Sequence, residues 1–147
     1  MALSLSTGLK NYVINKALVE AMAGTVGSAG SCDLKIYSGS QPTNADAATN
    51  GTILCTIEAI GWAATNGCTG GTAALYITGG YTGTASTSGT AGWARLEKVS
   101  TGYNGSAATF RIDGSVGTAS THTFVINAVS ITAGGVVSLL TAPISLS

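Results

Sequence analysis

The sequence predicts a mainly β protein, a single-domain β-sandwich or jelly roll with one N-terminal α-helix. Short segments that alternate apolar and polar residues recur every ten to fifteen residues after the first thirty. Gly, Ala, Ser and Thr make up 80 of the 147 residues, and they crowd between those segments. Only one stretch has the period of a helix. We therefore expect residues 1–24 to form an arm and helix, and residues 32–147 to form the β-sandwich with Gly/Thr/Ser-rich loops.

The helix is predicted from Gly8 to Ala23. Ser6 or Thr7 can accept a hydrogen bond from the first free amides, and Gly24 can end the helix in a left-handed conformation. Its polar strip is narrow, which fits either a helix lying on its own sheet or one also covered by a second subunit. The apolar positions are Tyr12, Val13, Ile14, Ala17, Leu18, Val19, Ala21 and Met22.

The strands are predicted from alternation, with one residue in two facing the core. In Cys32 to Ser38, Leu34 and Ile36 should face inward and Lys35 and Tyr37 outward. Pro143 has no amide donor, so the last strand should lie at an edge. The inward sets elsewhere are Ile53, Cys55 and Ile57; Ala108, Phe110 and Ile112; Phe124, Ile126 and Ala128; and Leu140, Ala142, Ile144 and Leu146. The stretch from Ala63 to Thr90 gives no clear pattern.

One hairpin is predicted by its charges. If Trp93 to Val99 pairs with Ala107 to Asp113 around Asn104, facing positions have numbers that add to 208. Arg95 then faces Asp113, and Glu97 faces Arg111. A slip of one residue would lose both pairs and exchange the two faces, so these charges should specify the register.

No residue pattern points to catalysis, so we expect a protein that is not an enzyme and holds no metal or cofactor. The three cysteines, Cys32, Cys55 and Cys68, have neither zinc-finger nor disulfide-framework spacing and should be reduced, packed thiols. His122 has no carboxylate or cysteine near it in sequence, which favours a structural role. Six basic residues balance six acidic ones without a run of either sign, so we expect no nucleic-acid partner, and no apolar stretch is long enough to predict a membrane span.

Three segments carry a resemblance. They are Leu5 to Asn11, the segment Ile36 to Pro42 followed by Ala45 to Ala48, and Gly89 to Arg95. Together they resemble small proteins encoded among the structural genes of tailed bacteriophages. The resemblance implies membership of the virion, with assembly in the host cytoplasm, and it implies no catalytic residues.

The expected function is that of a phage virion structural protein, most simply a capsid decoration or cement protein that binds the assembled shell as a homo-oligomer. Its partners would be the major capsid protein and copies of itself. A head–tail connector or tail component is the alternative within that class. A carbohydrate-binding adhesin module is the alternative outside it, with Trp62, Trp93, Tyr76 and Tyr81 as candidate sugar platforms. The expected contact residues are Ala2, Leu3, Ser4, Leu5, Ile144 and Leu146, since chain termini and strand edges readily join another chain.

Overall fold

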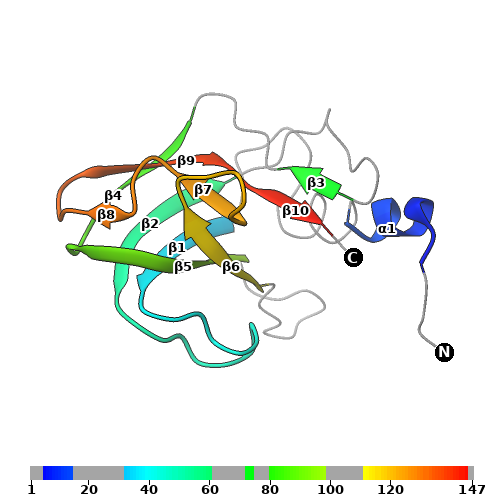
Figure 1. The fold of residues 1–147 in the computed structure, drawn as a ribbon, viewed down its shortest axis with the longest axis horizontal. Helices are drawn as coiled ribbons and strands as arrows, with labels where there is room; N and C mark the ends of the chain where they lie inside the picture. The colour runs from blue at the N-terminus through cyan, green and yellow to red at the C-terminus, as the bar shows by residue number, and fades with distance from the viewer. Residues whose placement is uncertain (1–4, 15–31, 61–71, 75–79, 99–110, 146–147) are drawn as a thin grey trace.

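The protein is mainly β with one short N-terminal helix (Figure 1). The computed structural model describes residues 5–14, 32–60, 72–74, 80–98 and 111–145. Its elements are α1 (Thr7–Ile14), β1 (Cys32–Ser38), β2 (Ile53–Ile60), β3 (Thr72–Ala74), β4 (Tyr81–Thr84), β5 (Gly89–Lys98), β6 (Arg111–Gly117), β7 (Phe124–Ile126), β8 (Ser130–Ile131), β9 (Val136–Thr141) and β10 (Pro143–Ser145).

The main sheet is mixed and nearly closes into a barrel. Its strands follow the order β2-β1-β5-β6-β7-β9-β4, with β8 added to β5, and only β6 and β7 run parallel. The two ends of that order, β2 and β4, meet at a bridge between Cys55 and Ala85. Just beyond it, the amides of Ser86 and Thr87 both donate to the carbonyl of Leu54. The expected pair of separate sheets is therefore replaced by one sheet that curls back on itself.

The core fills the inside of this curled sheet. Along β1, Cys32, Leu34 and Ile36 are fully buried, as the alternation predicted for the last two. Burying one such side chain stabilises the folded state by about 1.5–3 kcal/mol. This gain is the main force that closes the sheet. The other large core members are Leu54, Ile57, Ile60, Leu96, Phe124, Ile126, Ile131, Val137 and Leu139.

The predicted hairpin register is confirmed. In the β5–β6 pairing, Arg95 faces Asp113 and Glu97 faces Arg111, with Leu96 opposite Ile112. Leu96 is buried and Ile112 packs against the core, so the charged and apolar faces fall as predicted. The turn expected at Asn104 lies outside the described residues, as do Ala108 and Phe110.

Two predicted faces are wrong because β-bulges change the alternation. Ile36 pairs with Cys55 but Tyr37 pairs with Ile53, so the extra residue of β2 shifts the phase and leaves Ile53 38% exposed. A second shift between β7 and β9 leaves Leu140 without an opposite residue, and its side chain is 53% exposed. Ala128 is also exposed, because β7 ends at Ile126.

The helix begins as predicted. The Ser6 hydroxyl oxygen accepts a hydrogen bond from the amide of Leu9 at 3.3 Å, and the Ser6 carbonyl accepts one from Lys10 at 2.9 Å. Leu9, Tyr12 and Val13 are 46%, 61% and 40% exposed. The helix therefore presents apolar side chains to its surroundings. The predicted continuation to Ala23 lies outside the described residues.

The last strand is an edge, as its proline predicted, but it lies in a separate sheet, and the segment predicted as one strand from Leu140 onward is divided between β9 and β10. β10 pairs with β3 in a separate two-stranded sheet, with Pro143 opposite Ala74 and Ile144 opposite Ala73. A described strand with a single neighbour is an edge, where a missing amide donor costs nothing. Ala142, just before it, is fully buried.

A third bulge puts Ala59 in a left-handed conformation with φ of 57°. Its amide donates to the Asp33 carboxylate at 3.3 Å, opposite the point where the β1–β2 register shifts. A side chain in this region costs about 1–2 kcal/mol relative to glycine, which has no Cβ.

Ala59→Gly should therefore stabilise the protein. The net gain should be up to about 1 kcal/mol, because glycine has more conformational entropy to lose from the unfolded chain and this offsets part of the relieved strain. Urea denaturation would measure the difference. Ala128→Gly, at another exposed alanine without a positive φ, is the matched control and should destabilise. Loss of stability in both variants would contradict the strain assigned to Ala59.

Candidate functional site: an anchored loop on the outer face

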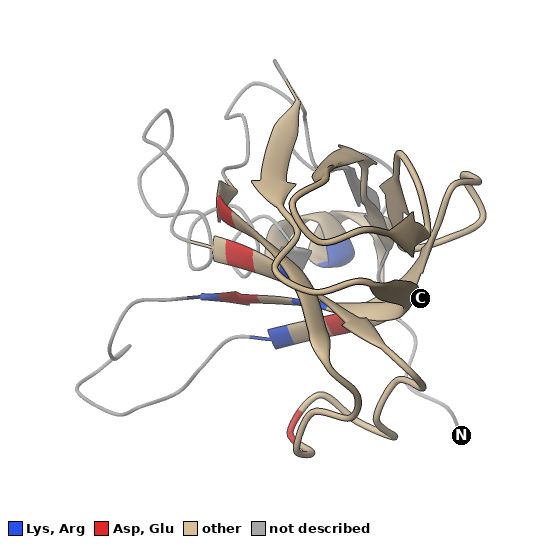
Figure 2. Ribbon diagram, turned by 90° about the vertical axis from the view of Figure 1, so that its left-hand side faces the viewer, with Lys and Arg blue, Asp and Glu red and all other residues tan. Residues whose placement is uncertain are grey.

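The charged residues gather on one part of the surface. Figure 2 shows them mainly on neighbouring strands, and the pairings identify these strands as β1, β5 and β6. By contrast, the sequence from 59 to 94 and from 114 to 147 has no Asp, Glu, Lys or Arg. The outer face of β1, β5 and β6 carries Asp33, Lys35, Arg95, Glu97, Arg111 and Asp113.

Arg95 and Asp113 form a buried, two-point ion pair on this face. The Nε and Nη2 groups of Arg95 donate to the two carboxylate oxygens of Asp113 at 2.6 and 2.7 Å. Each side chain is only 3% exposed. The bond to Asp113 raises the pKa of Arg95 above its ordinary value, against the opposing effect of burial. This geometry offsets the cost of removing two charges from water.

Two aromatic rings lie beside that pair. Tyr37 and Trp93 stack with ring centroids 4.4 Å apart and planes within 9° of parallel. The Arg95 guanidinium lies 5.5 Å from the centre of the Trp93 ring, close enough for a cation–π attraction. Tyr37 points outward from the sheet, as predicted, but it is only 4% exposed, so another part of the chain covers it.

The cover is the connection between β1 and β2, residues 39–52, which we call the anchored loop. The Trp93 indole donates to the carbonyl of Asn50 at 3.1 Å, and Arg95 Nη2 donates to the carbonyl of Ala47 at 3.3 Å. At the base of the loop, the Ser38 amide donates to the Thr52 carbonyl, while the Thr52 amide donates to the Ser38 hydroxyl, both at 3.0 Å. The loop is thus fixed along its length.

Within the loop, Asn44 makes a local turn. Its side-chain oxygen accepts hydrogen bonds from the amides of Asp46 and Ala47 at 3.0 and 2.9 Å. This turn presents the Ala47 carbonyl to Arg95. A connection of this length between adjacent antiparallel strands is far longer than the two to five residues a hairpin needs, and such loops are commonly functional.

Two close approaches of the backbone require glycine. A Cβ on Gly92 would lie 2.0 Å from the carbonyl oxygen of Gly39, and one on Gly51 would lie 1.8 Å from that of Ser38. Gly51 also has φ of 85°. The loop therefore packs backbone against backbone on β5, which side chains at these positions would prevent.

The anchored loop brings together two segments that are distant in sequence. Ile36 to Pro42 and Ala45 to Ala48 supply the stacked tyrosine and the loop, while Gly89 to Arg95 supplies the close-packed glycine, the tryptophan and the arginine. The two are about 50 residues apart in sequence and in direct contact in the structure.

Among the other charges of this face, Lys35 and Arg111 lie against Glu97, while Asp33 accepts a hydrogen bond from the Ala59 amide. Lys35 donates to Glu97, and that hydrogen bond raises the pKa of the Lys35 ammonium group. Arg111 lies 3.9 Å from the other Glu97 oxygen. Among the described residues, no group of three or more His, Cys, Asp or Glu is placed to hold a metal ion. The anchored loop is held to β5 at two points and exposes mostly polar residues.

The predicted sugar platforms are not supported where they can be seen. Trp93 is fully buried beneath the anchored loop, so it cannot present a ring to a sugar. Tyr81 is half-buried and packs against the core. Trp62 and Tyr76 lie outside the described residues.

The predicted contact residues are seen in part. Leu5 is half-buried, and Ile144 packs partly against the core cluster while its strand pairs with β3. Ala2, Leu3, Ser4 and Leu146 lie outside the described residues.

Cys32 and Cys55 are free, buried thiols, as predicted. Burial raises the pKa of Cys32 from 9.0 to about 12 and raises that of Cys55 as well. Cys68 lies outside the described residues. His122 is half-buried with its ring against Gly117, where a Cβ would lie 2.2 Å from the ring carbon Cδ2, so it serves as a packing residue.

Comparisons with protein-family models, with curated proteins and with solved structures found no match. In the part of the chain that the structure describes, no helix is long and apolar enough to cross a membrane.

Asp113→Ala should destabilise the protein by about 3–5 kcal/mol, because it leaves the Arg95 charge buried without a partner. Urea denaturation would measure the loss, and hydrogen exchange at the Ser38 and Thr52 amides would report release of the anchored loop. The double variant R95M/D113L removes both charges, so its free energy of unfolding should be closer to that of wild type.

The matched control for this cycle is Lys35→Ala, which breaks the partly exposed Lys35–Glu97 pair and should cost no more than about 1 kcal/mol. Equal effects of the Asp113 and Lys35 variants would show that the Arg95 pair does not anchor the loop.

Stability should fall as pH rises above 9.0, partly because of Cys32. The Cys32 thiol loses its proton near pH 9.0 in the unfolded chain but keeps it until about pH 12 in the folded protein. Between these two values, loss of the proton stabilises the unfolded state and so lowers the free energy of unfolding. Free energies of unfolding measured across this range should decline less steeply in Cys32→Ala than in wild type. Parallel curves would contradict the assignment.

Proposed function

We propose that this protein is a phage virion structural protein, a capsid decoration or cement protein that binds the assembled shell in many copies. The observation that supports the proposal is the anchored loop, because two of the three segments that resemble phage structural proteins meet there. A loop already fixed by Arg95 and Trp93 loses little entropy when it binds.

The separation of charge supports adhesion as the mechanism. The strands β4, β7, β8 and β9 have no charged residue (Figure 2), although Glu58 of β2 lies beside β4. On β1, β5 and β6, most of the charges form ion pairs with one another. An uncharged surface can join a neighbour without stranding a charge away from water. Each contact can be modest, since many symmetric copies on one particle add up.

Within this proposal the partners are the major capsid protein and copies of the chain itself, in the virion. We further propose that the curled sheet is a barrel-like form of the expected jelly roll, and that residues 2–5 and the edge near Ile144 and Leu146 are further contacts. A head–tail connector or tail component is the second candidate, because a rigid polar loop serves those joints equally well. The buried Trp93 speaks against the carbohydrate-binding alternative.

Purified protein should bind phage capsids that lack it, and should make them harder to disrupt by heat. Binding should change little between low and high salt, because few of its charges are free to form intermolecular ion pairs. Co-sedimentation and thermal release of the packaged DNA would measure both effects. Deletion of residues 2–5 should weaken binding without unfolding the domain.

Asp113→Ala, refolded and tested below its melting temperature, should bind less tightly than Lys35→Ala if the anchored loop is the contact. Capsids that are no more stable with the protein than without it would contradict the cement function. A location confined to the tail by immuno-labelling would favour the second candidate.

A further inference from the structure

Asn50 precedes Gly51 in the anchored loop, at the point where the main chain meets Trp93. An asparagine before a glycine can rearrange without an enzyme, because the backbone nitrogen of the glycine attacks the side-chain carbonyl carbon of the asparagine. Glycine favours this reaction, since it has no side chain to hinder the approach. The surroundings of the pair decide whether the reaction can occur in the folded protein.

Both reacting groups of this pair are accessible and unbonded. Asn50 and Gly51 are exposed, so water reaches them. Among the described residues, the Asn50 side-chain amide makes no hydrogen bond, and the Gly51 backbone amide donates to no acceptor. Neither group therefore has to lose a hydrogen bond within the protein before the two meet.

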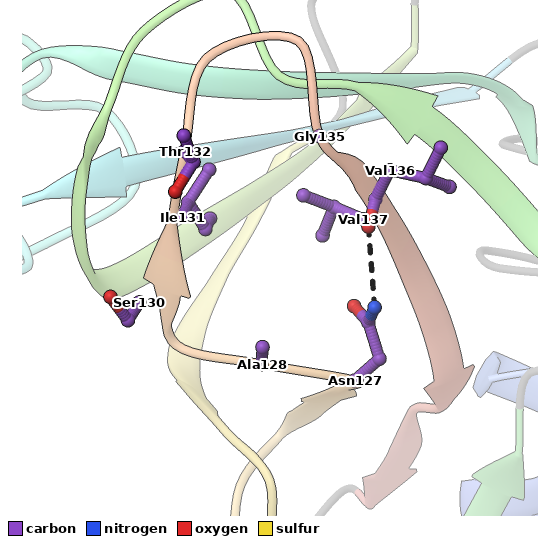
Figure 3. A pocket seen from close by; sticks show the side chains of 8 residues that line it. All are labelled: Asn127, Ala128, Ser130, Ile131, Thr132, Gly135, Val136 and Val137. Carbon is purple, nitrogen blue, oxygen red and sulfur yellow. Dashed lines mark hydrogen bonds between the residues drawn. The ribbon is translucent and has the colours of Figure 1, made fainter.

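Two other exposed asparagines provide a contrast. The Asn44 side-chain oxygen accepts two backbone hydrogen bonds. The Asn127 side chain donates to the Val136 carbonyl at 3.2 Å, as Figure 3 shows, and accepts from the Ser138 amide at 2.9 Å. Each of the two asparagines is followed by an alanine, whose Cβ hinders ring closure. They are internal references for a site at which the reaction is disfavoured.

The peptide unit between Asn50 and Gly51 is itself one of the anchors of the loop. Its carbonyl accepts the hydrogen bond of the Trp93 indole at 3.1 Å. Beside it, the backbone of Gly51 packs so closely that a Cβ would lie 1.8 Å from the carbonyl oxygen of Ser38. A longer main chain at this point could not keep both contacts.

We propose that Asn50–Gly51 is a site of spontaneous succinimide formation, and that the isoaspartate it yields breaks the fit of the anchored loop between Trp93 and Ser38. The Gly51 nitrogen bonds to the side-chain carbon Cγ of Asn50 and gives up its proton, while the side-chain nitrogen leaves as ammonia. Water then opens the five-membered ring at either carbonyl. One opening gives aspartate, and the other gives isoaspartate, in which the main chain runs through the side-chain carbons and is one atom longer. No oxidant or reductant is needed.

The inference does not rest on the proposed function, and it is tested on the isolated protein. Folded protein kept at mildly alkaline pH should accumulate aspartate and isoaspartate at position 50, while Asn44 and Asn127 in the same sample remain amides. Peptide mapping by mass spectrometry with electron-based fragmentation would measure each site separately. Asn66 and Asn104, which also precede glycine, lie outside the described residues and are measured in the same map. A position 50 that stays intact in folded protein but converts in urea would overturn the inference.

Asn50→Gln is the matched control, since it keeps an exposed amide but would have to close a larger ring. After the same incubation, the isoaspartate fraction of wild type should exchange the Ser38 and Thr52 amide hydrogens about fivefold faster than the glutamine variant, as expected for the loss of one hydrogen bond. Both proteins carry Asn66 and Asn104, so the difference reports on position 50. Equal exchange in the two samples would contradict the effect on the loop.

Asn50→Asp separates the new charge from the longer main chain. It places a carboxylate at the same position on an unaltered backbone, so its Ser38 and Thr52 amides should exchange at the rate of unmodified wild type. Faster exchange in freshly prepared Asn50→Asp would assign the effect to charge and overturn the mechanism based on the added atom. Circular dichroism would verify that both variants fold.

Discussion

The Arg95–Asp113 ion pair is the interaction on which the outer half of this protein depends. It joins β5 to β6, supports the Trp93 ring and holds the Ala47 carbonyl of the anchored loop. A buried charge pair is a costly way to gain stability, and an apolar pair would serve as well for that purpose alone. The advantage of an arginine is its geometry: the planar guanidinium donates hydrogen bonds to both the carboxylate and the loop, and so fixes their relative positions.

The molecule has two packed layers of different chemistry, one inside the curled sheet and one between the sheet and the anchored loop, and the Arg95–Asp113 pair belongs to the second. Inside the curled sheet, closure relies on aliphatic side chains such as Leu34, Leu96 and Phe124. Outside it, beneath the anchored loop, cohesion comes from hydrogen bonds and stacked rings around Trp93. Six of the twelve charged residues of the chain lie on the outer face of β1, β5 and β6, and Arg95 and Asp113 are buried there under the anchored loop.

The sequence predicted those features that depend on local periodicity or on pairs of opposite charge. The register of β5 against β6 followed from Arg95 and Asp113 because one slip would have broken both ion pairs. Bulges could not be predicted, since an extra residue in one strand leaves no mark in composition, and Ile53 and Leu140 were placed on the wrong face for that reason. The anchored loop was also missed as a site. The available signal was a long connection between two strands, together with Gly92 and Trp93 next to an arginine that already had a predicted partner.

The order of the strands has a consequence for how the chain folds. β1 pairs with β2 nearby in sequence, but its other neighbour, β5, follows about 55 residues later, and Asp113 later still. Sheets that rely on such distant pairing fold in milliseconds to seconds rather than microseconds, because long loops must close first. The loop between β1 and β2 has no ion pair to hold it until β6 arrives. The ion pair that orients the Arg95 anchor therefore forms only when β6 has joined β5.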